Sequence, residues 1–321
     1  MPPQAEKSSV VCGRAKACDS RARVGTLCAL GAVLLWGSNA VIGRHLAQAG
    51  TSMIVVAFLR VAIGALGLLA WLALRQQWPG GKGGGFELGR WSVFALLMYA
   101  ANMVVFHWAL GYVPASVVMV LESTAPLAVL LGGYLLFGES AGWRGGGAAL
   151  CAMTGVAVIG LARPGAGHAV MAPGGYAAGL VLALLAGVTW GGYTLACRGL
   201  GLGGNRTIPA AVVVLGGSAV LLLPLAVLKG GWPATPTDWL WTVVLGLAHT
   251  AVATVLWQTA LGHLPAFSVS LLFLGTIVLT MINEWLFLGE RLGPVQLLGA
   301  CVVMAAVLIG RTARPASAQA R

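Results

Sequence analysis

Ionisable residues inside long apolar stretches are the first candidates for chemistry in this sequence. Glu122 lies four residues before Pro126 in one such stretch. A charge at membrane depth is costly, so these residues usually face protein or water, and a proline frees a backbone carbonyl nearby. We hypothesise that Glu122 either pairs with a cationic substrate group or takes up a coupling proton, since burial disfavours the charged carboxylate. The alternative is a structural pair with a neighbouring Arg or His.

Two further charged residues lie within apolar stretches. Glu284 is a second candidate for proton coupling, and an ion pair between Glu284 and Arg60 is an alternative. For Arg60 we favour a structural anchor, because a long basic side chain can extend toward the membrane surface while its stem stays buried.

Aromatic residues stand three positions from an amide or a tyrosine in three apolar stretches. The pairs are Trp36 with Asn39, Tyr99 with Asn102, and Trp190 with Tyr193. Spacing i,i+3 places both members on one face of a helix, where stacking, cation–π contact and hydrogen bonds can hold an amphipathic metabolite. The alternative role of the polar members is packing between helices.

The predicted substrate-binding set combines these pairs with other polar and aromatic residues of the apolar stretches. It comprises Trp36, Asn39, Tyr99, Asn102, Glu122, Trp190, Tyr193, His249 and Trp257. The sequence suggests no catalytic residue, no metal site and no cofactor.

The elements that carry these residues are predicted membrane helices. The chain has 321 residues, of which 59% are hydrophobic and 8% charged, whereas soluble domains carry about 25% charged residues. Apolar stretches of the length that spans a bilayer recur throughout. We place ten spans at 25–44, 53–74, 91–111, 114–137, 143–161, 175–196, 208–228, 239–261, 264–287 and 293–311.

The basic residues orient these spans. Of the nineteen Lys and Arg residues, fourteen fall on one side, four on the other, and Arg60 lies within a span. Basic residues concentrate on the cytoplasmic side, so both termini are predicted to be cytoplasmic. The net charge of +11 therefore reflects membrane topology, and we expect no nucleic-acid partner.

The sequence also contains an internal repeat. Residues 109–116 match residues 260–267 at five of eight positions, an offset of 151 that also relates Gly138-Glu139 to Gly289-Glu290. Trp36-Gly37 recurs as Trp190-Gly191 at an offset of 154. Five spans in each half would invert the second copy. We predict an all-α membrane protein of ten transmembrane helices built as two inverted five-helix repeats.

The predicted organisation follows from these spans. It comprises a basic cytoplasmic tail at 1–24, the first repeat at 25–161, an external linker at 162–174, the second repeat at 175–311 and a cytoplasmic tail at 312–321. The repeats differ at one informative position, because Phe273 is the repeat mate of Glu122.

The sequence resembles the EamA-like family of the drug/metabolite transporter superfamily. The resemblance rests on Trp-Gly-Ser-Asn at 36–39, Phe-Leu-Arg at 58–60, the Ala-Leu…Pro-Ala junctions at 109–115 and 260–266, and the two Gly-Glu pairs. It implies a ten-helix carrier of the bacterial inner membrane, in a family whose members mostly export amino acids and related metabolites. It also implies a central cavity lined by spans 1, 3, 4, 6, 8 and 9.

The function expected is that of a multi-pass secondary transporter, a monomer or homodimer in the lipid bilayer, that exports a small-molecule substrate by alternating access. The sequence has no Gly-x-x-x-x-Gly-Lys-[Ser/Thr] motif for ATP. An exporter of cationic amphiphilic or nucleobase-like compounds is one alternative. A membrane-embedded enzyme is another, although the sequence has no His-Glu-x-x-His or Gly-x-Ser-x-Gly motif.

Overall fold

The fold is described from a computed structural model of the chain. It describes residues 4–75, 89–110, 112, 115–138, 142–161, 175–202, 206–288 and 293–312. Throughout these ranges the regular structure is helical. The predicted linker at 162–174 and the loop at 76–88 lie outside the described residues.

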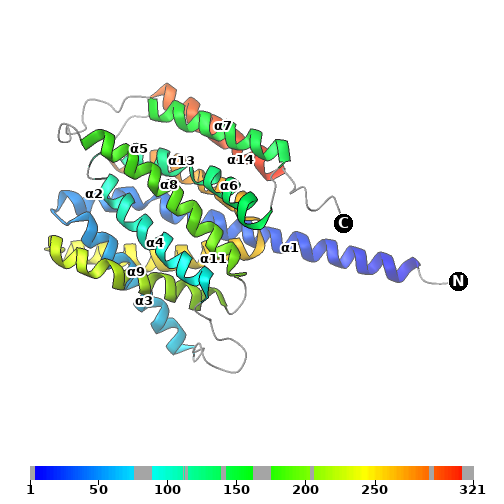
Figure 1. The fold of residues 1–321 in the computed structure, drawn as a ribbon, viewed down its shortest axis with the longest axis horizontal. Helices are drawn as coiled ribbons and strands as arrows, with labels where there is room; N and C mark the ends of the chain where they lie inside the picture. The colour runs from blue at the N-terminus through cyan, green and yellow to red at the C-terminus, as the bar shows by residue number, and fades with distance from the viewer. Residues whose placement is uncertain are drawn as a thin grey trace.

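The first half of the chain forms seven helical segments. They are α1 (Gln4–Gly37), α2 (Asn39–Gln48), α3 (Met53–Leu74), α4 (Arg90–Ala109), α5 (Ala115–Glu122), α6 (Ala125–Phe137) and α7 (Gly142–Leu161). The predicted second span coincides with α3, and α1 extends back into the predicted tail. Figure 1 shows this N-terminal part of α1 projecting beyond the bundle.

The second half forms eight segments. They are α8 (Gly175–Gly199), α9 (Thr207–Lys229), α10 (Pro236–Gly246), the π-helix η2 (Leu247–Val252), α11 (Ala253–His263), α12 (Ala266–Phe273), α13 (Gly275–Leu288) and α14 (Pro294–Thr312). Segments α10, η2 and α11 continue one another, so they occupy the single predicted span at 239–261.

Eight segments of the described chain are long and apolar enough to cross a membrane. They cover α1–α2, α3, α4, α5–α6, α8, α9, α10–α11 and α12–α13. The chain is therefore a multi-pass membrane protein in character. Helices α7 and α14 coincide with the other two predicted spans but are not among these eight segments. A total of ten spans therefore stays a prediction, and so does the orientation of the termini.

The helices of the two halves pack in matching pairs. The second predicted span of each half packs on its mate, α3 on α9, and the fifth does the same, α7 on α14. Figure 1 shows α7 and α14 side by side along one edge of the molecule. The first span of each half packs on the third span of the other half. Helix α1 contacts α11, which belongs to the third span of the second half, and α8 contacts α4, which is the third span of the first half. Exchanging the two halves therefore reproduces the contact pattern.

Two glycines set the closest approaches in this pattern. A β-carbon at Gly191 would lie 2.7 Å from Ala128 Cβ, and one at Gly37 would lie 2.5 Å from Leu279 Cβ. Gly37 and Gly191 are repeat mates at offset 154, and Ala128 and Leu279 are mates at offset 151. The same contact thus occurs twice, and each copy needs glycine because small residues let membrane helices approach closely.

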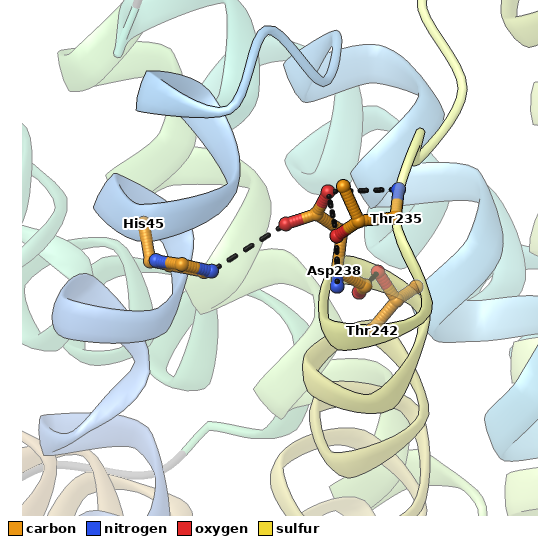
Figure 2. A network of polar contacts seen from close by, with 4 residues as sticks. All are labelled: His45, Thr235, Asp238 and Thr242. Carbon is orange, nitrogen blue, oxygen red and sulfur yellow. Dashed lines mark hydrogen bonds and ion pairs between the residues drawn. The ribbon is translucent and has the colours of Figure 1, made fainter.

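A polar network joins the end of α2 to the start of α10 (Figure 2). The Asp238 carboxylate accepts hydrogen bonds from the backbone N–H of Thr235, at 3.1 Å, and from its hydroxyl, at 2.7 Å. The Asp238 N–H donates back to Thr235 Oγ1 at 3.2 Å, which completes a capping box at the N-terminus of α10. His45 Nε2 lies 3.4 Å from the other carboxylate oxygen. This network ties two spans that are distant in the sequence.

Candidate functional site

Four irregularities interrupt the helices of the predicted spans. The fourth predicted span breaks after Glu122, between α5 and α6, and the ninth breaks after Phe273, between α12 and α13. The first span breaks at Ser38, and the eighth contains the π-helix η2. Broken helices at membrane depth expose backbone groups that can bind a ligand, and π-helical turns are common at functional sites.

Glu122 is buried at its helix break, with 4% of its surface exposed. Asn102 Nδ2, on α4, donates to Glu122 Oε1 at 3.0 Å and also to the backbone carbonyl of Ala186 on α8 at 3.0 Å. The amide of Asn102 therefore holds the carboxylate in a fixed position between α4, α5 and α8.

Gly187 allows α8 to approach this break. A β-carbon at Gly187 would lie 2.9 Å from the carbonyl oxygen of Leu121 and 3.0 Å from that of Glu122. Those oxygens are backbone atoms, so they could not move without displacing the end of α5. Gly187 and Gly191 are one turn apart, so one face of α8 fits both sides of the break.

Three tryptophans and a phenylalanine form the centre of the site. Trp36 and Trp190 are repeat mates, and their ring centroids lie 5.0 Å apart in an edge-on arrangement. Trp257 lies 5.3 Å from Trp36 and 5.6 Å from Trp190. Phe273 stacks on Trp190 at 5.2 Å. We call these four residues the aromatic cluster.

Two tyrosines extend the aromatic cluster toward α4. The rings of Tyr99 and Tyr193 lie 4.9 Å apart, and Trp190 contacts both, at 6.4 and 5.3 Å. Gln258 Nε2 donates to the Tyr193 hydroxyl at 3.1 Å. Both tyrosines are almost fully buried.

Arg60, on α3, lies against η2, and only 5% of its surface is exposed. Its Nε donates to Thr250 Oγ1 at 2.9 Å, and its Nη2 lies 3.4 Å from the backbone carbonyl of His249. With its amide oxygen turned toward the guanidinium, Asn39 accepts from both terminal nitrogens at 3.1 Å. Trp36 Nε1 donates to the same His249 carbonyl at 2.9 Å, which connects Arg60 to the aromatic cluster.

The two halves contribute different chemistry at equivalent positions. Asn39 and Thr250, which both contact Arg60, have Tyr193 and Tyr99 as their repeat mates. At these equivalent positions one pair of residues therefore contacts a guanidinium, whereas the other is a pair of tyrosines in ring contact. Glu122 and Phe273 differ in the same manner at the two helix breaks.

Seven of the nine predicted binding residues are joined through the contacts of the aromatic cluster and of Arg60, and the other two, Asn102 and Glu122, contact each other. Tyr99 and Asn102 share α4, and Trp190 and Tyr193 share α8, as the spacing indicated. Trp36 and Asn39 instead lie on either side of the break at Ser38, so they do not share one continuous helix. The role of the nine residues in binding stays a prediction.

Other polar candidates serve the packing. Asn283 donates to the carbonyls of Leu279 and Gly37, at 2.8 and 3.3 Å, and so joins α13 to α1. His107 Nδ1 lies 2.7 Å from the Met103 carbonyl of its own helix. Glu284 lies on α13, and its side chain is outside the described residues.

Three residues outside the predicted binding set contact its members or one another, namely Arg60, Thr250 and Phe273. Arg60 was expected to reach the interface, but its partners hold it inside the protein. The offset of 151 between Tyr99 and Thr250 is the signal that could have identified Thr250, because repeat mates occupy equivalent places.

Comparison with known families gives one match across both halves of the chain. The model of the EamA-like transporter family matches residues 23–161 and again residues 177–311. The two matches correspond to two copies of the same domain, which agrees with the internal repeat.

Similar proteins of known or assigned role are exporters. The chain is 29% identical over 214 residues to a probable terminal-alkyne amino-acid exporter of Streptantibioticus cattleyicolor, covering 65% of this chain and 68% of that protein. It is 32% identical over 134 residues to the threonine/homoserine exporter RhtA of Escherichia coli K12, covering 40% of this chain and 43% of that protein. It is also 29% identical over 292 residues to the uncharacterised protein PA1977 of Pseudomonas aeruginosa, covering 88% and 95%.

A solved crystal structure has the same fold. It superimposes with a TM-score of 0.71 and 21% sequence identity, over 89% of this chain and 95% of the other. At this level of identity the likeness concerns the architecture alone.

Proposed function

Because this chain belongs to the EamA-like transporter family, we propose that it exports amino acids or related small metabolites across the bacterial inner membrane. Family membership and the exporters among its relatives point to a transporter rather than an enzyme. The helical fold and the two copies of the family domain support a membrane carrier whose substrate site lies between the two repeats.

One observation carries the choice of substrate class. Glu122 is a buried carboxylate at a helix break, held by the amide of Asn102, which lies three residues from Tyr99 on α4. A carboxylate in such a place attracts a cationic group, and aromatic faces favour both a cation and an apolar side chain. The α-amino group and side chain of an amino acid supply both features.

The proposed mechanism is alternating access. The helix breaks at Glu122 and Phe273 lie at equivalent places in the two repeats, so movement of one repeat against the other would open the site to each side in turn. Glu122 would exchange the substrate amine for a proton during this cycle. We expect the protein to act as a monomer or homodimer in the bilayer, without a cofactor.

Counterflow in proteoliposomes tests this function. Vesicles loaded with unlabelled amino acids should accumulate the same radiolabelled amino acid, and accumulation should saturate and prefer the L-isomer. Threonine, homoserine and phenylalanine are suitable first probes, because they span polar and aromatic side chains. Accumulation no greater than in protein-free vesicles for all common amino acids would refute amino-acid transport.

The aromatic cluster also supports a second candidate, a carrier of cationic amphiphilic compounds. Three indole rings and Glu122 could accept a flat organic cation without any carboxylate. Counterflow of a radiolabelled quaternary ammonium dye in place of an amino acid would favour this candidate.

A further inference from the structure

Arg60 carries a buried positive charge whose described contacts are all neutral. They are the Thr250 hydroxyl, the Asn39 amide oxygen and the His249 backbone carbonyl. No carboxylate is among these described contacts of Arg60. A buried cation without an anionic partner is costly, and more so at membrane depth.

The same region has hydrogen-bond donors to spare. The indole N–H groups of Trp190 and Trp257 are buried and have no partner among the described residues. Both rings contact Trp36, whose own N–H shares the His249 carbonyl with Arg60. The buried Oε1 of Gln258, the residue after Trp257, also has no partner among the described residues. Buried polar groups are nearly always hydrogen-bonded, so these two donors and this acceptor suit a ligand that carries both acceptors and donors.

Glu122 supplies a buried carboxylate, which is held by Asn102. The described hydrogen bonds of Arg60 do not include this carboxylate. A buried cation and a buried anion that do not pair with each other match the two charged ends of a zwitterion.

We infer that Arg60 binds the α-carboxylate of the transported amino acid. This inference rests on the proposed function and sharpens it, since it makes a free carboxylate a requirement for transport. Asn39 and Thr250 are positioning residues that hold the planar guanidinium in place, and Nη1 keeps one N–H that no described contact uses. Glu122 takes the α-amino group, and the aromatic cluster provides apolar surface for the side chain.

Substrate analogues test the inference without any mutation. L-Threoninamide and L-phenylalaninamide keep the amine and side chain of the parent amino acid but lack the negative charge. In counterflow against radiolabelled L-threonine or L-phenylalanine, each amide should compete about tenfold or more weakly than its parent, as expected for loss of a charge-assisted hydrogen bond. Equal competition by acid and amide would overturn the inference.

Variants then assign this preference to Arg60. Arg60→Gln should weaken competition by the acid until acid and amide compete alike, and Arg60→Lys should retain only part of the preference. Glu122→Gln is the matched control, because it should weaken competition by the acid and competition by the amide equally. The ratio between the two should therefore stay that of the wild-type protein. If Arg60→Gln keeps the wild-type ratio, Arg60 does not bind the carboxylate.

Two positioning variants keep the test decisive if Arg60→Gln does not fold. Thr250→Val and Asn39→Ala each remove one acceptor from the guanidinium, so each should lower the acid-to-amide preference in protein whose melting temperature is near that of wild type. An unchanged preference in both would contradict the inference. Failure of the proposed function looks different, since wild-type protein would then carry neither labelled amino acid.

Discussion

At the scale of single residues, the site depends on the places where the two repeats differ. Equivalent helix breaks carry Glu122 in one half and Phe273 in the other. Asn39 and Thr250 surround a guanidinium, whereas their mates Tyr193 and Tyr99 pack ring against ring. A symmetric scaffold thus holds an asymmetric set of side chains, as recognition of an asymmetric molecule requires.

Glu122→Gln should lower transport about tenfold or more and abolish its dependence on pH. The variant can still accept the hydrogen bond from Asn102, but a neutral amide neither attracts an amine as strongly nor takes up a proton. Initial rates of counterflow at several pH values measure both effects. Melting temperature should stay near that of wild type. Unchanged transport with unchanged pH dependence would exclude Glu122 from the mechanism.

At the scale of elements, the site depends on how closely α8 approaches the break between α5 and α6. Gly187 meets the carbonyls of Leu121 and Glu122, and Gly191 meets Ala128 and the carbonyl of Ala125. The position of Glu122 is therefore set by the absence of side chains on one face of α8.

Gly187→Ala should destabilise the protein by about 1–3 kcal/mol, because the new methyl group meets backbone carbonyls that cannot rotate away. Thermal unfolding of the purified protein in detergent should show a lower midpoint and a loss of transport. Gly147→Ala on α7 is the matched control, since nothing lies within 4 Å of its added carbon and alanine favours a helix over glycine. Equal midpoints for the two variants would contradict this account of the packing.

The capping box of α10 gives a second prediction at this scale. Thr235→Ala removes the hydroxyl that accepts the Asp238 N–H, and loss of an N-cap costs about 1 kcal/mol. The unfolding midpoint should fall, while Thr235→Ser should keep the cap and the wild-type midpoint. A midpoint that is the same for alanine and serine would show that the cap contributes nothing.

At the scale of the whole molecule, the helices pack in two patterns. A helix packs on its own repeat mate, or two helices from different halves pack together and their two repeat mates form an equivalent pair. The pairs α3 with α9 and α7 with α14 show the first pattern, and α1 with α11 and α4 with α8 show the second. Because the halves interleave, neither half builds the site alone. Trp36 and Trp190, one from each half, meet at its centre.

Reporter fusions test the predicted orientation. A reporter active only in the cytoplasm should work when fused after Lys82, and one active only outside should work after His168, because the excess of basic residues places the loop at 75–90 inside and the linker at 162–174 outside. Fusion of either reporter after Arg321 should behave like fusion after Lys82. The reverse pattern of activity would refute this topology.

Most of the architecture could be predicted from the sequence, because its physical signals are local. Apolar length predicts membrane helices, repeated motifs predict a duplication, and the helices of the described chain coincide closely with the predicted spans. The aromatic and amide candidates could be found in the same manner, because a polar group within an apolar helix needs a partner.

What only the tertiary structure decided is which of these groups meet. Residues beside the break at Ser38 contact residues more than two hundred positions away. The indole N–H of Trp36, for example, donates a hydrogen bond to the backbone carbonyl of His249. Burial of Arg60 depends on the π-helical turn that presents Thr250 to it. Helix periodicity carries no information about such distant contacts, so the sequence by itself determined the helices and their duplication, and packing of the two halves decided the site.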